Sequence, residues 1–295
     1  MLNQLTNQIS RLEQKLYRTT PDTGHDLPIF ARGRLTLTSG EPVLTANVIG
    51  AATLYFTPYL GCYDFSEVPF ALGPLAANTN HDIFLENLSV LSATAWATAT
   101  ARATTLTRYQ GYLSLTGDSA KRYVGSIRIG PTKGQTDMIL EGGNGTVVAT
   151  PARLFVWNHY NRIFQRAKVS EAGAWGYGPG GFRQMNNSAN NQLEFIIGLS
   201  EDAVQAMGKV QAAITDTENI NVSIGLDVVN AAAVDSQQNA FLFTGITGAT
   251  LSMSSFYNGY PGIGYHFLAP IEAAGAGSGL WYGGATQSFH GIIHG

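Results

Sequence analysis

The residues with the clearest potential for catalysis are two carboxylates on predicted strands. Glu194 lies in the apolar run LEFIIGL at 193–199, and Asp227 lies on the polar face of the run INVSIGLDV at 220–228. Glycoside hydrolysis needs two carboxyl groups roughly 5–9 Å apart, one of them in an apolar setting that raises its pKa. Carboxylates on polar strand faces are usually just solvated, so we expect no catalytic residue and no enzymatic activity. Polysaccharide degradation is the enzymatic alternative.

The sequence contains no recognisable metal, nucleotide or nucleophile motif. HExxH, Cys/His clusters and the GxSxG elbow are absent. The glycine-rich segments at 130–136 and 176–181 lack the Gly-Lys-Ser/Thr run that binds phosphate at a helix start. His290 and His294 are four residues apart, and only a multimer that gathers its C-termini would bring enough of them together for a metal ion. We therefore expect no metal and no cofactor.

A glycine-rich tail carries the one positive sign of a binding surface. From residue 256 onward, aromatic residues are interspersed with glycines and polar residues. Aromatic rings in loops can stack on sugar faces, but aromatic residues are also typical of cores and subunit contacts. The tail therefore predicts either packing or a receptor surface for host glycan. The residues of that receptor surface would be Tyr257, Tyr260, Tyr265, Trp281 and Tyr282.

The first seventeen residues show a heptad pattern with polar flanks. The apolar residues are spaced 3, 4, 3 and 4 apart, which is the seam of a coiled coil. They are Leu2, Leu5, Ile9, Leu12 and Leu16. Because Pro21 and Gly24 follow, the predicted helix ends near residue 18. The seam predicts self-association or docking on another protein, and packing across the chain's own body is the alternative.

Short runs bounded by turn residues fill most of the chain after residue 30. The strongest strand is 220–228, where apolar and polar residues alternate throughout. Segment 200–214 fits a helix capped by Ser200, and a strand is its rival. Segment 68–77 predicts a loop because of its prolines and glycine, and 95–106 predicts a short helix or a strand pair. Many short strands are typical of a sandwich or barrel.

These patterns predict a mostly β fold. A short, coiled-coil-like N-terminal α-helix would precede two β-sandwich or jelly-roll-like domains. Residues 170–191 are rich in Gly, Asn and Ser without periodicity, which indicates a domain boundary, or else a long loop within one domain. The predicted parts are an oligomerisation or docking helix at 1–18, a linker at 19–29, a β-sandwich domain at 30–168, a Gly/Asn-rich linker at 169–191 and a distal β domain at 192–295.

Composition excludes several classes of function. Charged residues make up only 13% of the 295 residues, about half the usual share. Residues 169–295 contain two basic side chains against nine acidic ones, so they offer no basic footprint for nucleic acid or anionic membranes. Cys62 is the only cysteine, so no intrachain disulfide can form. We also expect no signal peptide and no transmembrane helix.

Four stretches resemble a known group of proteins. They are GRLTLTSGEPVLTANVIGAATLYFTPYLG (33–61), RYQGYLSLTGDSAKRYVGSIRI (108–129), RLFVWNHYNRI (153–163) and NQLEFIIGLSEDAVQA (191–206). Together they resemble virion structural proteins of tailed bacteriophages and prophages, which are described as fibre, tail or hypothetical structural proteins. The resemblance implies a β-rich body and a place in the virion, is compatible with three-fold assembly, and carries over no catalytic residue.

The leading interpretation is a non-enzymatic phage structural protein. We expect a homotrimeric tail or head fibre, made in the host cytoplasm and released by lysis, with adhesion to host-surface glycan. Its partners would be copies of itself and other virion proteins that contact the N-terminal helix. The alternatives are a capsid decoration or tail-connector component without a receptor role, and a polysaccharide-degrading tail protein.

Overall fold

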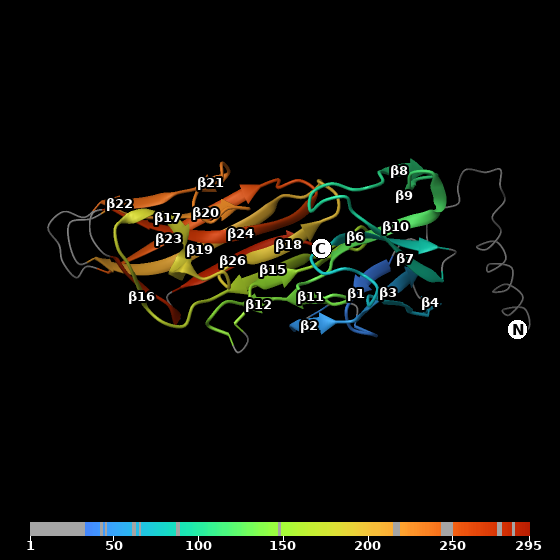
Figure 1. Ribbon diagram of the computed structural model, residues 1–295, viewed down its shortest axis with the longest axis horizontal. Helices are drawn as coiled ribbons and strands as arrows, with labels where there is room; N and C mark the ends of the chain where they lie inside the picture. The colour runs from blue at the N-terminus through green and yellow to red at the C-terminus, as the bar shows by residue number, and fades with distance from the viewer. Residues whose placement is uncertain are drawn as a thin grey trace, which may run out of the picture.

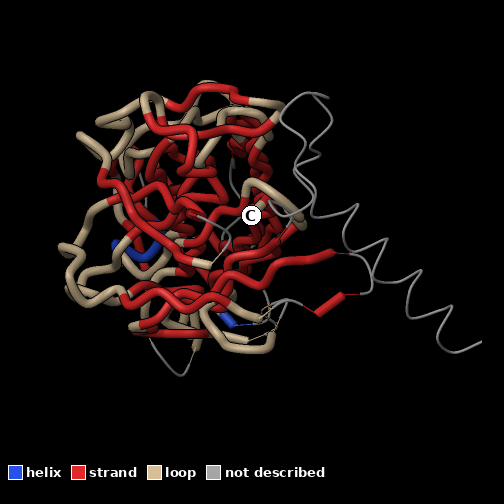
Figure 2. Tube along the Cα trace, turned by 90° about the vertical axis from the view of Figure 1, so that its right-hand side faces the viewer, coloured by secondary structure: helices blue, strands red, loops and turns tan. Residues whose placement is uncertain are grey.

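The computed structural model describes residues 33–41, 44, 46–60, 63–64, 66–86, 89–146, 149–214, 219–242, 250–275, 279–284 and 287–295. These residues form an elongated body built almost entirely of β-strands (Figure 1). A view turned by 90° shows strands across most of the section, joined by loops (Figure 2). The mostly β prediction is therefore confirmed. The predicted helix at 1–18 and the linker at 19–29 lie outside the described residues.

Two smaller sheets occupy one end of the body. In the first, β3 pairs with three neighbours. Its strands are β1 (Gly33–Thr36), β3 (Thr53–Leu60), β4 (Tyr63–Asp64) and β5 (Val68–Ala71). The second has the order β7-β6-β10-β9-β8, with β14 also against β10. Its strands are β6 (Asn80–Glu86), β7 (Val90–Ala95), β8 (Leu106–Tyr109), β9 (Tyr112–Leu115), β10 (Asp118–Arg128) and β14 (Val156–Asn158).

Two eight-stranded sheets form the rest of the body. Large sheet 1 has the order β2-β11-β13-β18-β24-β20-β22, with β17 beside β24. Its strands are β2 (Val48–Ala51), β11 (Thr136–Ile139), β13 (Ala152–Leu154), β17 (Gly180–Gln184), β18 (Leu193–Ile197), β20 (Asn219–Leu226), β22 (Asn239–Leu242) and β24 (Gly264–Ala274).

Large sheet 2 has the order β12-β15-β26-β19-β23-β21, with β25 beside β19 and β16 beside β25. Its strands are β12 (Glu141–Gly142), β15 (Phe164–Val169), β16 (Trp175–Tyr177), β19 (Val204–Ile214), β21 (Ser236–Gln237), β23 (Thr250–Gly259), β25 (Gly279–Tyr282) and β26 (Ser288–His294). A 3-10 turn, η2 (Met185–Asn187), follows β17.

Both large sheets cross the predicted domain boundary. In large sheet 1, β13 pairs in parallel with β18, so that Leu154 lies opposite Phe195. In large sheet 2, β15 pairs over its whole length with β26, near the C-terminus. Residues 169–191 themselves supply β16, β17 and η2, and they bury Trp175 and Met185. This segment is therefore part of the sheets and does not connect two separate sandwiches.

The segment at 200–214 forms strand β19, so the helix interpretation is wrong and its rival is correct. Val204, Ala206 and Val210 are buried, whereas the residues between them are more exposed. This alternation has the period of a strand. The small residues in this segment also suit a helix, so its own sequence does not select the strand. The strand is stabilised by pairing with β23 on one side and with β26 and β25 on the other.

Two predicted segments near the small sheets also differ from expectation. Residues 68–77 were predicted as a loop but contain β5, which pairs with β3 at the edge of its sheet. An edge strand tolerates Pro69, because the side of the proline that lacks an N–H can face away from the neighbouring strand. Residues 95–106 form neither a helix nor a strand pair. A single antiparallel bridge between Trp96 and Arg102 closes a loop there.

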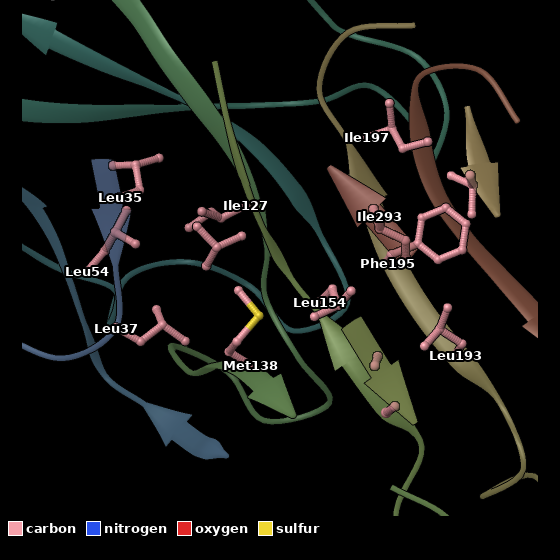
Figure 3. Packing of buried hydrophobic residues seen from close by; sticks show 14 of the residues in the cluster. Leu35, Leu37, Leu54, Ile127, Met138, Leu154, Leu193, Phe195, Ile197 and Ile293 are labelled. Atoms are coloured by element: carbon pink, nitrogen blue, oxygen red, sulfur yellow. The ribbon is translucent and has the colours of Figure 1, made fainter. Parts of the chain in front are cut away.

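The main hydrophobic core fills the space between the two large sheets and continues to the small sheet of β1 and β3. Figure 3 shows this continuity, from Leu35 through Ile127 to Phe195 and Ile293. The two large sheets approach closely, because a Cβ on Gly291 of β26 would lie 2.3 Å from Leu193 Cδ2. A larger residue at this position would have to displace the Leu193 side chain.

A second core cluster lies between the two large sheets, where β16, β19, β23 and β25 meet β20 and β24, and it includes Met185 of η2. Trp175, Met185 and Trp281 are among its members. The fully buried Glu272 of β24 accepts hydrogen bonds from Trp175 Nε1 at 2.8 Å and from Arg183 Nε at 3.0 Å. Burial nevertheless raises the pKa of Glu272 to about 7. This carboxyl group therefore makes the stability of the fold depend on pH.

Between pH 4.5 and 7, folded Glu272 keeps a proton that the unfolded chain has released. The free energy of unfolding should therefore fall as pH rises through this window, by at most about 1.4 kcal/mol per unit from this group. We expect Glu272→Gln to remove that part of the slope in denaturant titrations at pH 5, 6, 7 and 8. Glu41→Gln, at an exposed position, is the control and should leave the slope unchanged. Equal slopes for Glu272→Gln and the unaltered chain would contradict the assignment.

Candidate functional site

The candidate site is the outer face of large sheet 2, over β15, β26, β19 and β23. Side chains alternate between the two faces of each strand. Ala167, Val169, Phe289 and Ile293 point inward and belong to the main core. The alternate residues point outward, where described residues leave much of their surface uncovered.

Four large apolar side chains cross this outer face in a continuous diagonal. Phe164 is 74% exposed, Phe256 45%, and Met207 and Ile292 39% each. Met207 and Phe256 are direct cross-strand neighbours. Ile292 lies opposite Gln205, one outward position along β19 from Met207, and Phe164 lies opposite His294, one outward position along β26 from Ile292. We call these four residues the apolar strip.

A shallow hollow of about 490 Å³ adjoins the strip. Met207, Phe256 and Ile292 form its apolar part, and the amides of Gln205 and Asn258 line it beside them. Apolar side chains surrounded by a few polar groups are the usual composition of a protein contact surface or a ligand hollow.

The hollow also has a basic side. Arg166 Nη2 lies 3.1 Å from His290 Nδ1, and Lys168 lies opposite His290 on β15. Burial, together with the charges of Arg166 and Lys168, lowers the pKa of His290. The imidazole is therefore neutral at pH 7, and Nδ1 accepts a hydrogen bond from the guanidinium. Glu141 lies beside Lys168 and is the acidic neighbour at this side.

The structure does not gather the predicted receptor residues on one surface. Tyr257 is 2% exposed in the main core and Trp281 is 0% exposed in the second cluster, so a receptor role for these two is wrong. Tyr265 packs under the Arg128 guanidinium, 3.7 Å from its ring centroid. Tyr260 is 68% exposed in the loop after β23, and Tyr282 is partly exposed on β25.

The two predicted carboxylates have separate partners. Arg153 Nε donates to Glu194 Oε2 at 2.9 Å, and the same guanidinium bonds Asp137. Asp227 lies 2.8 Å from His266 Nδ1, and its other oxygen accepts the Phe267 amide. Each carboxylate is thus engaged in a local ion pair or turn. This arrangement favours a structural role for both.

The two C-terminal histidines have different partners. His290 faces Arg166, and His294 Nδ1 pairs with Asp202 at 3.0 Å. Within the described part of the chain, no group of three or more His, Cys, Asp or Glu side chains is arranged to hold a metal ion. Nor does any described helix have the length and apolar character to cross a membrane.

Sequence reasoning missed the apolar strip. In FQRAKV, Phe164 shares a strand face with Arg166 and Lys168, which is an available sign of an outward-facing aromatic residue. Met207 lay in the segment where helix and strand competed, so its face could not be assigned. Phe256 and Ile292 lie in segments with apolar residues on both strand faces, so the sequence pattern does not show which of these residues are exposed.

No protein-family model and no curated protein matches the chain. Among solved structures, the infectious bursal disease virus Gx strain is 12% identical at a TM-score of 0.29, covering 90% of this chain and 73% of that one. The T13 particle of the same virus is 14% identical at 0.29, covering 85% and 64%. The Gt strain is 13% identical at 0.29, covering 85% and 65%. A TM-score of 0.29 is too low to assign a fold or a function.

The burial of Trp281 and the exposure of Tyr260 predict opposite effects of truncation. We expect Trp281→Ala to lower the free energy of unfolding by about 3–5 kcal/mol, because it leaves a cavity in the second cluster. Tyr260→Ala should change it by less than about 0.5 kcal/mol. Denaturant titration followed by tryptophan fluorescence and circular dichroism measures both. A Trp281→Ala chain as stable as Tyr260→Ala would show that Trp281 is not buried in the folded protein.

Proposed function

We propose that this chain is a non-enzymatic structural protein of a bacteriophage virion, which assembles as a homotrimer in a tail or head fibre. The observation that carries the proposal is the exposed apolar strip on the outer face of large sheet 2. Phe, Met and Arg are enriched at protein interfaces, and the strip and its border contain all three. A surface of this composition supports contact with other protein chains.

The rest of the body is compatible with an assembled protein. It is elongated, with large sheets that run through most of its length (Figure 1). Its low share of charged residues suits a surface that is partly buried between subunits. The resemblance of residues 33–206 to phage virion proteins supports the virion location, and the heptad seam at 2–16 supports self-association through the N-terminal segment.

Attachment to host-surface glycan is the finer part of the proposal. Of the five aromatic residues considered for it, Tyr260 is the most exposed of the three that are not buried, and it lies in a loop. An exposed tyrosine ring can stack on a sugar face. A receptor role would therefore use the loop after β23, together with the partly exposed Tyr282.

The assembly state tests the proposal directly. We expect light scattering of the full chain to give three times the mass of one subunit. Leu5→Gln with Leu12→Gln should reduce the mass to that of one subunit, because both residues occupy position d of the seam. Asn3→Gln with Ser10→Gln, on the outward side of the same segment, is the matched control and should leave the trimer intact. A single-subunit mass for the unaltered chain would refute the proposal.

A further inference from the structure

We propose that the apolar strip is the seat of the N-terminal segment, residues 2–16, of a neighbouring copy of this chain. The inference builds on the self-association proposed above and assigns the surface that receives the segment. In this arrangement each copy would supply one segment and one strip.

The first described residue, Gly33, contacts the loop that leads into β15 and Phe164. Asn161 Nδ2 donates to the Gly33 carbonyl at 3.3 Å, and Arg34 Nη1 donates to the Asn161 carbonyl at 2.7 Å. Arg34 Nη2 also reaches the carbonyl of Gly295, which follows the strand that carries Ile292. Asn161 precedes Phe164 by three residues. These contacts place Gly33 near the Phe164 end of the strip.

The strip and the predicted helix have the same length. From Phe164 to Phe256 the diagonal crosses three strand spacings and four residues along the strands, which is about 20 Å at roughly 4.8 Å per strand and 3.4 Å per residue. A helix from Leu2 to Leu16 is about 21 Å long at 1.5 Å per residue. Its five apolar residues form one stripe, and the strip offers one apolar row.

The borders of the two surfaces also fit. In the heptad, the positions beside the seam are occupied by Thr6, Gln8, Glu13 and Lys15. They carry no net charge and match the amides of Gln205 and Asn258, which line the hollow. Glu13 supplies a carboxylate for the basic side at Arg166. The segment therefore brings no uncompensated charge onto the strip.

The connection between seam and body is long enough to reach another copy. Residues 17–32 span up to roughly 50 Å when extended, at about 3.3 Å per residue. A segment seated on its own strip would need only a fraction of this length, because Gly33 already contacts Asn161, three residues before Phe164. When the copies are related by a rotation axis, such exchange gives a closed oligomer, because every N-terminal segment is then bound by the strip of one neighbouring copy.

Cross-linking between two distinguishable chains tests the proposal. One chain carries Ile9→Cys, and the other carries Met207→Cys and a size tag; both carry Cys62→Ser. After the two are co-assembled, a short bismaleimide should give a product that joins the two chains. Val90→Cys replaces Met207→Cys in the control, because Val90 is 54% exposed on β7, outside large sheet 2. We expect at least tenfold more product with Met207→Cys.

The outcomes separate this inference from the proposed function. Equal or absent product at the two positions, from a sample that light scattering shows to be trimeric, would overturn the strip as the seat and leave the trimer standing. A chain with both Ile9→Cys and Met207→Cys that cross-links only within itself would overturn exchange between copies. A single-subunit mass before cross-linking would refute the proposed function as well.

Substitution of the strip is a second, independent measurement. We expect Phe256→Ser to weaken trimer formation at least tenfold in a dilution series, because it removes an exposed ring from one end of the contact. Val90→Ser should leave it unchanged. Both positions are exposed, so circular dichroism should show that each variant is folded. Equal dissociation midpoints for the two variants would contradict the assignment.

Discussion

Large sheet 2 has an apolar inner face, and its outer face carries an apolar strip that the described body leaves uncovered. The inner face is packed against large sheet 1, at a contact so close that a side chain at Gly291 would displace that of Leu193. Alternation along the same strands sends Phe164, Met207 and Ile292 to the other side. A strand cannot bury both of its faces against one partner sheet. The residues that pack into the core therefore also determine which alternate side chains stay exposed on the outer face.

The same sheet brings the beginning and end of the described chain together. β15 pairs with β26, Ile163 and Gly295 exchange backbone hydrogen bonds, and Arg34 bonds the carbonyls of Asn161 and Gly295. The first described residues, Gly33 and Arg34, are thus anchored beside the strands that carry part of the apolar strip. In the proposed exchange, the point where the docking segment joins the body and the surface that receives a segment would therefore lie close together on each copy.

The sequence predicted an element correctly where its pattern of apolar and polar residues fitted only one type of secondary structure. β20 was recognisable because its apolar and polar residues alternate without exception, so sheet neighbours had no alternative to choose between. β19 was ambiguous because alanine and glycine suit helix and strand alike, and pairing on both edges decided for the strand. The segment at 169–191 has no periodicity, yet the buried Trp175 and Glu272 hold it in place through a contact between residues about a hundred positions apart. Contacts of that range leave no local signal, and for the same reason Tyr257 and Trp281 could not be told from exposed aromatic residues.

The composition around the strip limits which contacts it can make. Arg166, Lys168 and His290 border one side, so two strips facing each other would place like charges together and leave both heptad seams uncovered. A heptad seam placed on the strip avoids this repulsion because its flanking residues carry no net charge. The contact also covers the seam and the strip together. Such a pairing is also finite, because each chain has one donor segment and one acceptor face, whereas stacking of sheet faces or edges has no intrinsic end. In the proposed exchange, an exposed apolar row on a weakly charged protein therefore favours a closed assembly over aggregation.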